Sequence, residues 1–403
     1  MQSFRSPSQP QDLPHTHDVV LGGASPAPMG GVVLGGLMGV KSRLQSAAVP
    51  QRLAALREAL HYGDEGLDLV IQALADDAAA VQKLARLMLW HRPEPQARQA
   101  IADYSHFSLF DNLYTLAGHA EPVTALVLSR NGKLLFSAGV DKVVRIWHIP
   151  SGNLVRTLQG HSQIITALAL TPDGKTLISG SRDRTIKLWN LSGDITCRTL
   201  SGHLGYVNSV SVAPNGKTLV TGSQDTTIKL WDLTTGQEIR TLRGHTNLVD
   251  GVALSPNGRY IASCSWDTTI RIWDIQTAEQ VWEFVGHSAR VLSFAISPNS
   301  KTLVSGSLDT TIKVWDLASG KAIRTLDGHW GWVKSLLISR DGQHLVSASY
   351  KVIKIWNLHT GDEIQTLNGH INLINTIALS HDGQTLVSGG EDRKIHVWGI
   401  PQV

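Results

Sequence analysis

Cysteine is nearly absent from this chain, whose 403 residues include only Cys197 and Cys264. Two cysteines cannot form a disulfide framework, and this pair lacks metal-ligand spacing. We therefore expect both to be small buried hydrophobic residues in a protein of a reducing compartment.

The chain also lacks a strong charge imbalance and a long hydrophobic run. Its net charge of +3 is too small, at this length, to indicate a polyanionic partner. The N-terminus is polar and proline-rich, without the hydrophobic segment of a signal peptide. Glycines and two prolines interrupt the apolar stretch 19–40, which falls short of the ~20 apolar residues of a membrane span. We expect a cytoplasmic protein with no membrane span, in which residues 1–40 are a disordered, Gly-rich leader or dock on a neighbouring surface.

The abundant feature is a repeat. Gly-His dipeptides recur in steps of 42 residues, with one step of 41, and a tryptophan follows each histidine 28 residues later, or 27 in the sixth unit. Short alternating runs such as "ALAL" and "IKLW" lie between turn sequences such as "TPDG" and "SPNG". This pattern predicts four short strands in each of seven units.

The repeat resembles the WD40 family, whose repeats form the blades of a β-propeller. The resemblance implies an all-β, seven-bladed propeller over residues 109–403. A strand-like segment at 112–116 precedes the first Gly-His dipeptide, whereas the last unit has no fourth strand of its own. We expect this segment to join the last blade and close the ring, which leaves no open sheet edge.

A histidine, a serine or threonine, a tryptophan and, outside the sixth unit, an aspartate recur at fixed positions. Ser-His-Asp is the constellation of nucleophilic hydrolysis, but a set repeated in almost every unit is not an active site. No nucleophile elbow, oxyanion-hole turn or phosphate loop accompanies it. The resemblance implies instead a structural hydrogen-bond network in each blade. Its members, unit by unit, are His119, Ser137, Asp141, Trp147; His161, Ser179, Asp183, Trp189; His203, Thr221, Asp225, Trp231; His245, Ser263, Asp267, Trp273; His287, Ser305, Asp309, Trp315; His329, Ser347, Trp356; and His370, Ser388, Asp392, Trp398.

The sixth unit, "SASYKVIKIW", is one residue shorter than its neighbours and lacks the aspartate. We expect a tighter turn with Tyr350 in it or beside it, an incomplete network, and the locally least stable blade. Whether the deletion belongs to a binding site or reflects drift in a tolerant blade stays open.

The resemblance also implies that three positions in each blade point to one face around the central channel. At these positions the chain is unusually aromatic, and aromatic and arginine residues dominate binding hot spots. The alternative is that the rings fill the channel mouth or cover loops. The predicted partner-binding residues are Tyr206, Trp266, Arg290, Leu308, Trp332 and Tyr350.

Charges on the same face are mixed, with Arg182 and Lys334 against Asp250 and Glu391, which disfavours nucleic acid. A basic residue two positions before each tryptophan, replaced by His396 in the last unit, is interpreted as a packing position. No cofactor or metal site is expected, because the "HTH" of residues 15–17 lies in the leader.

Residues 41–108 are rich in Ala and Leu and predict four helices. "QRLAAL" and "QKLARL" match at an offset of 31, and helix pairs of this period resemble HEAT repeats. The whole arrangement is similar to bacterial WD40-repeat proteins.

These features predict a non-catalytic scaffold that binds protein or peptide partners through the propeller face and the helical segment. The alternative is a regulatory subunit that positions an enzyme or a signalling protein. A propeller enzyme with a small-molecule substrate, or a nucleic-acid binder, has less support.

Overall fold

The computed structural model describes residues 36–193 and 195–402, and the chain divides into two compact units between Ala85 and Arg86. The sequence places this boundary near residue 108. The difference arises because residues after Ala85 contact the propeller: His91 Nε2 lies 3.2 Å from the Pro401 carbonyl oxygen, and Ser105 Oγ lies 3.0 Å from His344 Nε2. Phe107 is fully buried in a hydrophobic core that also contains Trp398. The segment ahead of the first strand is therefore anchored in the second unit. Of the predicted leader, residues 1–40, the first 35 lie outside the described residues.

Four helices lie where the sequence predicts them: α2 (Val49–Ala59), α3 (Gly63–Gln72), α4 (Ala79–Trp90) and α5 (Pro95–Ala100). Short 3-10 helices are η1 (Leu60–Tyr62), η2 (Ala73–Ala75), η3 (His106–Leu109) and η4 (Ile149–Ser151). Gly66 allows α3 to approach α2 closely, because a Cβ at this position would lie 1.8 Å from the Ala59 carbonyl oxygen. In the described part of the chain, no helix is long and apolar enough to cross a bilayer.

A fifth helix, α1 (Gly36–Leu44), is not predicted by the sequence, which assigns its first residues to the leader. Gly36 and Gly39 lower its intrinsic helix propensity. Packing compensates, since Val40 is fully buried and Arg43 Nη1 donates to Glu58 Oε1 of α2 over 3.2 Å. Tertiary contacts, and not local propensity, therefore decide that this segment is helical.

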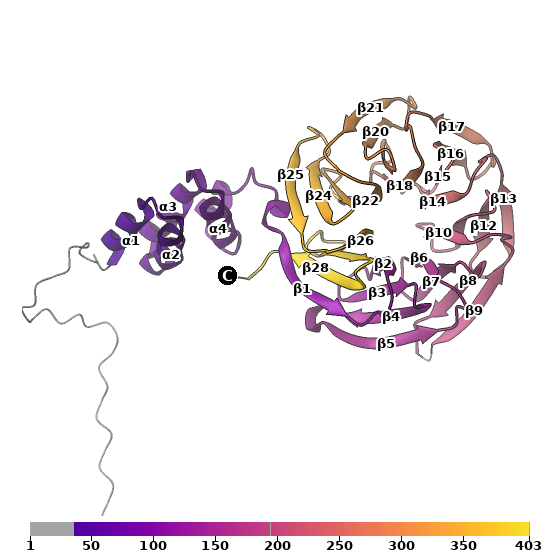
Figure 1. Cartoon of the computed structure of the whole chain (residues 1–403), viewed down its shortest axis with the longest axis horizontal. Coiled ribbons are helices and arrows are strands. Elements are labelled where there is room, and N and C mark those ends of the chain that lie inside the picture. Colours follow the sequence, from indigo (N-terminus) through magenta and orange to yellow (C-terminus); the bar gives the residue numbers. More distant parts are fainter. Residues whose placement is uncertain (1–35, 194, 403) are drawn as a thin grey trace, which may run out of the picture. The chain divides into compact units, whose positions relative to one another are not determined.

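The second unit is a ring of seven four-stranded antiparallel sheets (Figure 1), which confirms the predicted all-β propeller. Each sheet is one blade, and its four strands lie side by side in order from the central channel to the rim. The innermost strands of blades one to seven are β2 (Val123–Leu128), β6 (Ile165–Leu170), β10 (Val207–Val212), β14 (Val249–Leu254), β18 (Val291–Ile296), β22 (Val333–Ile338) and β26 (Ile374–Leu379). The second strands are β3 (Leu134–Gly139), β7 (Thr176–Ser181), β11 (Thr218–Ser223), β15 (Tyr260–Ser265), β19 (Thr302–Ser307), β23 (His344–Ser349) and β27 (Leu386–Gly390).

The third and fourth strands complete each blade. The third strands are β4 (Val143–His148), β8 (Thr185–Asn190), β12 (Ile228–Asp232), β16 (Ile270–Asp274), β20 (Ile312–Asp316), β24 (Val352–Asn357) and β28 (Lys394–Gly399). The outer strands are β5 (Asn153–Gln159), β9 (Thr196–Ser201), β13 (Glu238–Leu242), β17 (Gln280–Phe284), β21 (Ala322–Leu326), β25 (Glu363–Asn368) and, in blade seven, β1 (Asp111–Ala117).

The seventh blade joins the two ends of the second unit. β1 pairs antiparallel with β28, with Thr115 opposite His396, so segments far apart in the sequence lie side by side (Figure 1). The outer strands are the exposed ones, and Cys197 on β9 is accordingly exposed. The prediction that both cysteines are buried is therefore correct for Cys264 and wrong for Cys197.

The hydrophobic core lies between neighbouring blades. Val304 and Leu326 of blade five, for example, share one cluster with Leu336 and Trp356 of blade six. The glycine of each Gly-His dipeptide is part of this packing. A Cβ on it would lie 2.8–3.3 Å from Cη2 of the blade's tryptophan, in all seven blades. The recurring pairing of glycine and tryptophan in the sequence thus has a steric cause.

Candidate functional site

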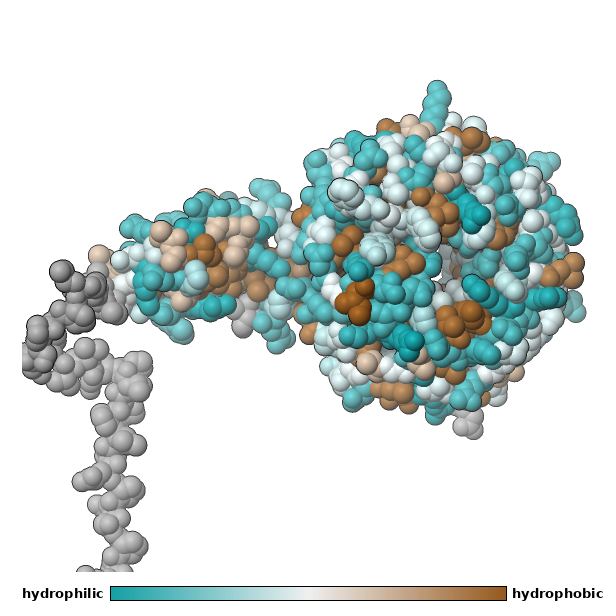
Figure 2. All heavy atoms as spheres, viewed as in Figure 1, coloured by the Kyte–Doolittle hydropathy of each residue, from teal (hydrophilic) through white to brown (hydrophobic). Residues whose placement is uncertain are grey.

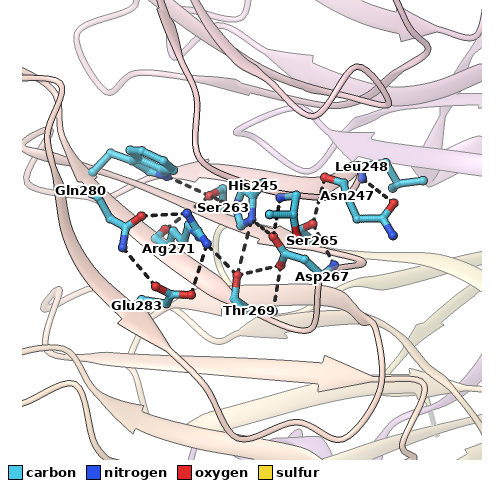
Figure 3. A network of polar contacts seen from close by, with 12 residues as sticks. His245, Asn247, Leu248, Ser263, Ser265, Asp267, Thr269, Arg271, Gln280 and Glu283 are labelled. Atoms are coloured by element: carbon cyan, nitrogen blue, oxygen red, sulfur yellow. Dashed lines mark hydrogen bonds and ion pairs between the residues drawn. The ribbon is translucent and has the colours of Figure 1, made fainter.

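Each blade contains a histidine, a hydroxyl residue and a tryptophan in hydrogen-bond contact, and Figure 3 shows them in blade four. Trp273 Nε1 donates to Ser263 Oγ over 2.9 Å, and Ser263 Oγ lies 2.8 Å from His245 Nε2. His245 Nδ1 lies 2.7 Å from Asp267 Oδ2. The same three bonds, of 2.7–3.0 Å, are present in blades one, two, three, five and seven.

The carboxylates of these networks are held in the ionised form. Burial acts to raise the pKa of Asp141, but hydrogen bonds from His119 and Arg145 outweigh it and hold that pKa at about 2. The pKa of Asp267 is lowered in the same way, against the effect of burial, by His245 and Thr269. An ionised aspartate fixes the histidine tautomer, because the Nδ1–H of the histidine donates to the carboxylate. The Nε2 of the same ring then accepts from the hydroxyl.

These sets share the geometry of a hydrolase triad but give no access to a substrate. The hydroxyl residues have 0% solvent exposure in every blade. Each hydroxyl oxygen also accepts the tryptophan N–H, as Ser263 does from Trp273 over 2.9 Å. A nucleophile buried and bonded in this way cannot reach a carbonyl group from solvent. The bonds therefore contribute to stability, at about 1 kcal/mol each.

Blade six departs from this arrangement. His329 Nε2 lies 2.7 Å from Ser347 Oγ, but among the described residues His329 Nδ1 is buried without a hydrogen-bond partner. Burial, assisted by Lys354, lowers the pKa of His329 to about 4. The missing aspartate thus leaves an unpaired polar atom in the blade, at a cost of about 1–3 kcal/mol.

The shortened turn of blade six consists of Tyr350 and Lys351, between the paired residues Ser349 and Val352. Tyr350 has a φ of +49°, in the left-handed region that glycine normally occupies. The deletion therefore places a bulky ring at the tip of a strained two-residue turn.

The basic residues two positions before each tryptophan are engaged within their own blades. Lys229 Nζ lies 2.7 Å from Glu238 Oε2, and Arg271 Nη2 lies 3.2 Å from Glu283 Oε1 on the outer strand (Figure 3). Lys313 Nζ donates to Thr325 Oγ1 over 3.1 Å. This series is consequently not a free positive ring that would attract a polyanion.

Three of the predicted partner-binding residues lie together at blades four and five. The Arg290 guanidinium stacks 3.8 Å from the ring centroid of Trp266, and the Leu308 backbone N–H donates to the Arg290 carbonyl over 3.0 Å. Arg290 is exposed, whereas Trp266 and Leu308 are half-buried. Spacing alone does not reveal that Arg290 covers Trp266, so Trp266 offers less free surface than the sequence suggests.

Blade six presents the largest exposed rings on adjacent connections. Trp332 is 52% exposed and Tyr350 is 55% exposed, and Trp330 beside them is 98% exposed. Ser349 Oγ donates to the Gly331 carbonyl over 2.7 Å, which ties the two connections together. We name the rings of Trp330, Trp332 and Tyr350 the blade-six aromatic cluster; more than half of each side chain is open to solvent.

Tyr206, the sixth predicted residue, lies apart from this group. Its ring is 5.7 Å from the Arg182 guanidinium of blade two, on the far side of blade three from Trp266. On the face shown in Figure 2, hydrophobic residues form several small groups near the central opening, with hydrophilic residues between them.

The channel positions in the first strands serve mainly to join blades. Asn208 Nδ2 donates to the Val249 carbonyl of the next blade over 3.0 Å, and Asn375 Nδ2 donates to the Val123 carbonyl over 2.9 Å. Blade four has Asp250 at this position. Burial raises the pKa of Asp250 to about 6, against the opposing effects of Lys334, Trp266 and Arg290.

Comparison with known families gives one extensive match. The family described as "WD domain, G-beta repeat" matches the chain in seven segments: 110–148, 152–190, 195–232, 236–274, 278–316, 320–357 and 361–399. Each segment contains the outer strand of one blade and the three inner strands of the next. No curated protein matches the chain.

Proposed function

Because the chain belongs to the WD40-repeat family, whose propellers generally act as non-enzymatic interaction scaffolds, we propose that it binds a protein or peptide partner through the turns of blades four to six. The site consists of the blade-six aromatic cluster together with Trp266, Arg290 and Leu308. We place this function in the cytoplasm, since Cys197 and Cys264 are free thiols.

The blade-six aromatic cluster is the observation that carries the proposal. Trp330, Trp332 and Tyr350 are all more than half exposed, although tryptophan and tyrosine are mostly buried in a folded chain. Burial of such rings against a partner removes large apolar areas from water at about 25 cal/mol per Å². Trp and Tyr are also the residues most enriched in binding hot spots.

The stack of Arg290 on Trp266 supports the same surface. The guanidinium is held 3.8 Å from the indole ring, so its side chain is partly ordered before a partner arrives. Ordering a long side chain costs about 0.5–1.5 kcal/mol on binding, and preorganisation reduces this cost. The exposed donor groups of Arg290 would then bond a carboxylate or a carbonyl of the partner.

The helical unit, residues 36–85, is the second contact surface in this proposal. Met38 and Tyr62 are exposed large hydrophobic residues on it. Short helical arrays that bury little core of their own typically bind other proteins.

The experiment compares capture of partners from host lysate by wild type and by Trp266→Ala/Trp332→Ala/Tyr350→Ala, with mass spectrometry as the readout. The matched control is Ile239→Ala/Trp282→Ala/Ile323→Ala, which removes exposed apolar side chains from outer strands instead. Circular dichroism establishes that all three proteins are folded.

We expect a protein that wild type and the outer-strand control capture and that the face variant loses. Equal capture by all three would refute the proposed face. It would favour the helical unit as the main contact surface, and capture by a variant that lacks the residues up to Ala85 would test this.

A further inference from the structure

Blade seven has a histidine where the other six blades have lysine or arginine. This residue, His396 on β28, is 5% exposed. Its Nδ1 lies 2.8 Å from Asn112 Nδ2 and 3.2 Å from Thr115 Oγ1, both on the closing strand β1. Within the described part of the chain, its Nε2 is buried and has no hydrogen-bond partner. A buried imidazole nitrogen without a partner is costly and calls for a ligand that would satisfy it.

Two further donor side chains converge on His396. His370, Asp392 and His396 each offer one ligand atom, and these atoms lie within 4.8 Å of one another. The imidazole rings of His370 and His396 are 4.2 Å apart, and His370 Nδ1 lies 2.7 Å from Asp392 Oδ2. The His370 and Asp392 side chains are 0% and 1% exposed. Two imidazoles and one carboxylate form a donor set that suits zinc and related divalent metals.

Blade one shows what occupies the corresponding space elsewhere. There Arg145 Nη1 lies 2.5 Å from Asp141 Oδ2 and 2.8 Å from His119 Nδ1, so a cationic nitrogen bridges the aspartate and the histidine. Histidine is mostly neutral at pH 7, unlike arginine or lysine. Blade seven therefore keeps the buried carboxylate and loses the cationic side chain beside it.

We propose that His370, Asp392 and His396 bind a divalent transition metal of the zinc class, in the space that a side-chain cation occupies in blade one. The ion supplies the positive charge that His396 lacks and binds its unpaired Nε2. The proton of the His396 ring then resides on Nδ1 and is donated to Thr115 Oγ1, or to the Asn112 amide oxygen after rotation of that amide. It joins β28 to the β27–β28 turn and to the connection ahead of β26.

The geometry requires small adjustments of the donor atoms. Zinc ligands at about 2.0–2.1 Å from the ion in a tetrahedron lie about 3.3 Å apart. The donor atoms are within 4.8 Å of one another, so none would approach another by more than about 1.5 Å. His370 Nδ1 and Asp392 Oδ2, which are 2.7 Å apart, would instead separate by about 0.6 Å and exchange their hydrogen bond for bonds to the ion. If His370 binds through Nδ1, its proton resides on Nε2 and is donated to Ser388 Oγ, which lies 2.7 Å away. A second bond of this kind orients metal-ligating histidines.

The blades also provide a matched pair of substitutions. His396→Lys restores the residue type of the other blades and removes one ligand without leaving a cavity. Arg271→His in blade four creates the same triad with His245 and Asp267, so a second ion should bind. His15→Ala/His17→Ala removes the two histidines that lie closest together in the sequence.

The experiment uses the full, untagged chain, stripped with a chelator and titrated with Zn²⁺ and with Co²⁺. Bound metal is measured by elemental analysis after dialysis, ligation by the Co²⁺ absorption spectrum, and stabilisation by the thermal midpoint. We expect one ion for wild type and for His15→Ala/His17→Ala, and two for Arg271→His. His396→Lys should weaken binding by more than about 100-fold, since loss of even an outer-shell partner costs 10–100-fold.

Two results would overturn the proposal. One is that stripped wild type retains no ion after dialysis at micromolar Zn²⁺. The other is that His396→Lys binds as much metal, with the same Co²⁺ spectrum, as wild type. Neither result affects the proposed partner face, which lies on other blades.

Discussion

Replacing Asp267 with alanine should create in blade four the state that blade six has naturally. Asp267 accepts four hydrogen bonds: from His245 Nδ1 over 2.7 Å, from the Thr246 N–H over 3.0 Å, and from the Thr269 N–H and Oγ1 over 3.0 and 2.7 Å. Its side chain is only 5% exposed, so solvent screens these bonds little. After the substitution, His245 Nδ1 would be buried without a partner, as His329 Nδ1 is in blade six.

The expected cost follows from which of these groups can reach water. Thr246 is exposed and can exchange its bond for water, whereas His245 is buried and cannot. Loss of a charge-assisted bond together with an unpaired buried donor costs about 3 kcal/mol in total. Asp267→Asn, which keeps the shape and an acceptor oxygen, should cost about half as much. The exposed Asp327→Ala should change stability by less than about 0.5 kcal/mol.

Two measurements check this prediction. Urea unfolding gives the free energy of unfolding, and hydrogen exchange resolved by blade shows whether blade four becomes as labile as blade six. A cost below about 1 kcal/mol, or unchanged hydrogen exchange in blade four, would refute the view that the aspartate completes the network.

Three further predictions concern other parts of the molecule. Tyr350→Gly should stabilise the protein by about 1 kcal/mol in urea unfolding, because φ is +49° there and a bulky residue in that region is strained; a loss of stability would contradict this, and Tyr350→Phe should be neutral. His329, whose pKa burial lowers to about 4, takes up a proton more readily in the unfolded chain. Stability should therefore fall as pH drops from about 6.5 towards 4, by about 2 kcal/mol at pH 5. Asp250, whose pKa burial raises to about 6, should offset part of this loss, because the folded state gains about 1 kcal/mol of stability from its protonation as pH falls from about 6.5 to 5. His329→Gln should abolish the first contribution, and an unchanged pH profile would contradict the assignment. Gly66→Ala should destabilise the helical unit by about 3 kcal/mol, because its Cβ would lie 1.8 Å from a backbone oxygen of α2; hydrogen exchange should rise in residues 36–85 and stay unchanged in the blades.

Most of the propeller can be predicted from the repeat pattern, because the repeated residues contact one another within each blade. Gly118 and Trp147, for example, recur as a pair since the glycine lies against the indole ring. The helix α1 could not be predicted in the same way, because its stability comes from contacts such as that of Arg43 with Glu58. Such contacts leave no periodic signal in the sequence.

The candidate sites also combine features that the sequence predicts with features that depend on tertiary contacts. The exposure of Trp332 is consistent with its predicted place on the face, whereas the stack of Arg290 on Trp266 depends on side-chain conformations that spacing does not specify. His396 stands out in the sequence as the one histidine in a basic series. Its proximity to His370 becomes visible only once the strands of blade seven are in register.

The most direct test of the central claim is a hydrogen-exchange map of the full chain with and without a captured partner. The partner face predicts slower exchange in residues 329–332, 349–352 and 288–291, with the outer strands unchanged. Protection confined to the outer strands or to residues 36–85, with these three connections unaffected, would contradict the account.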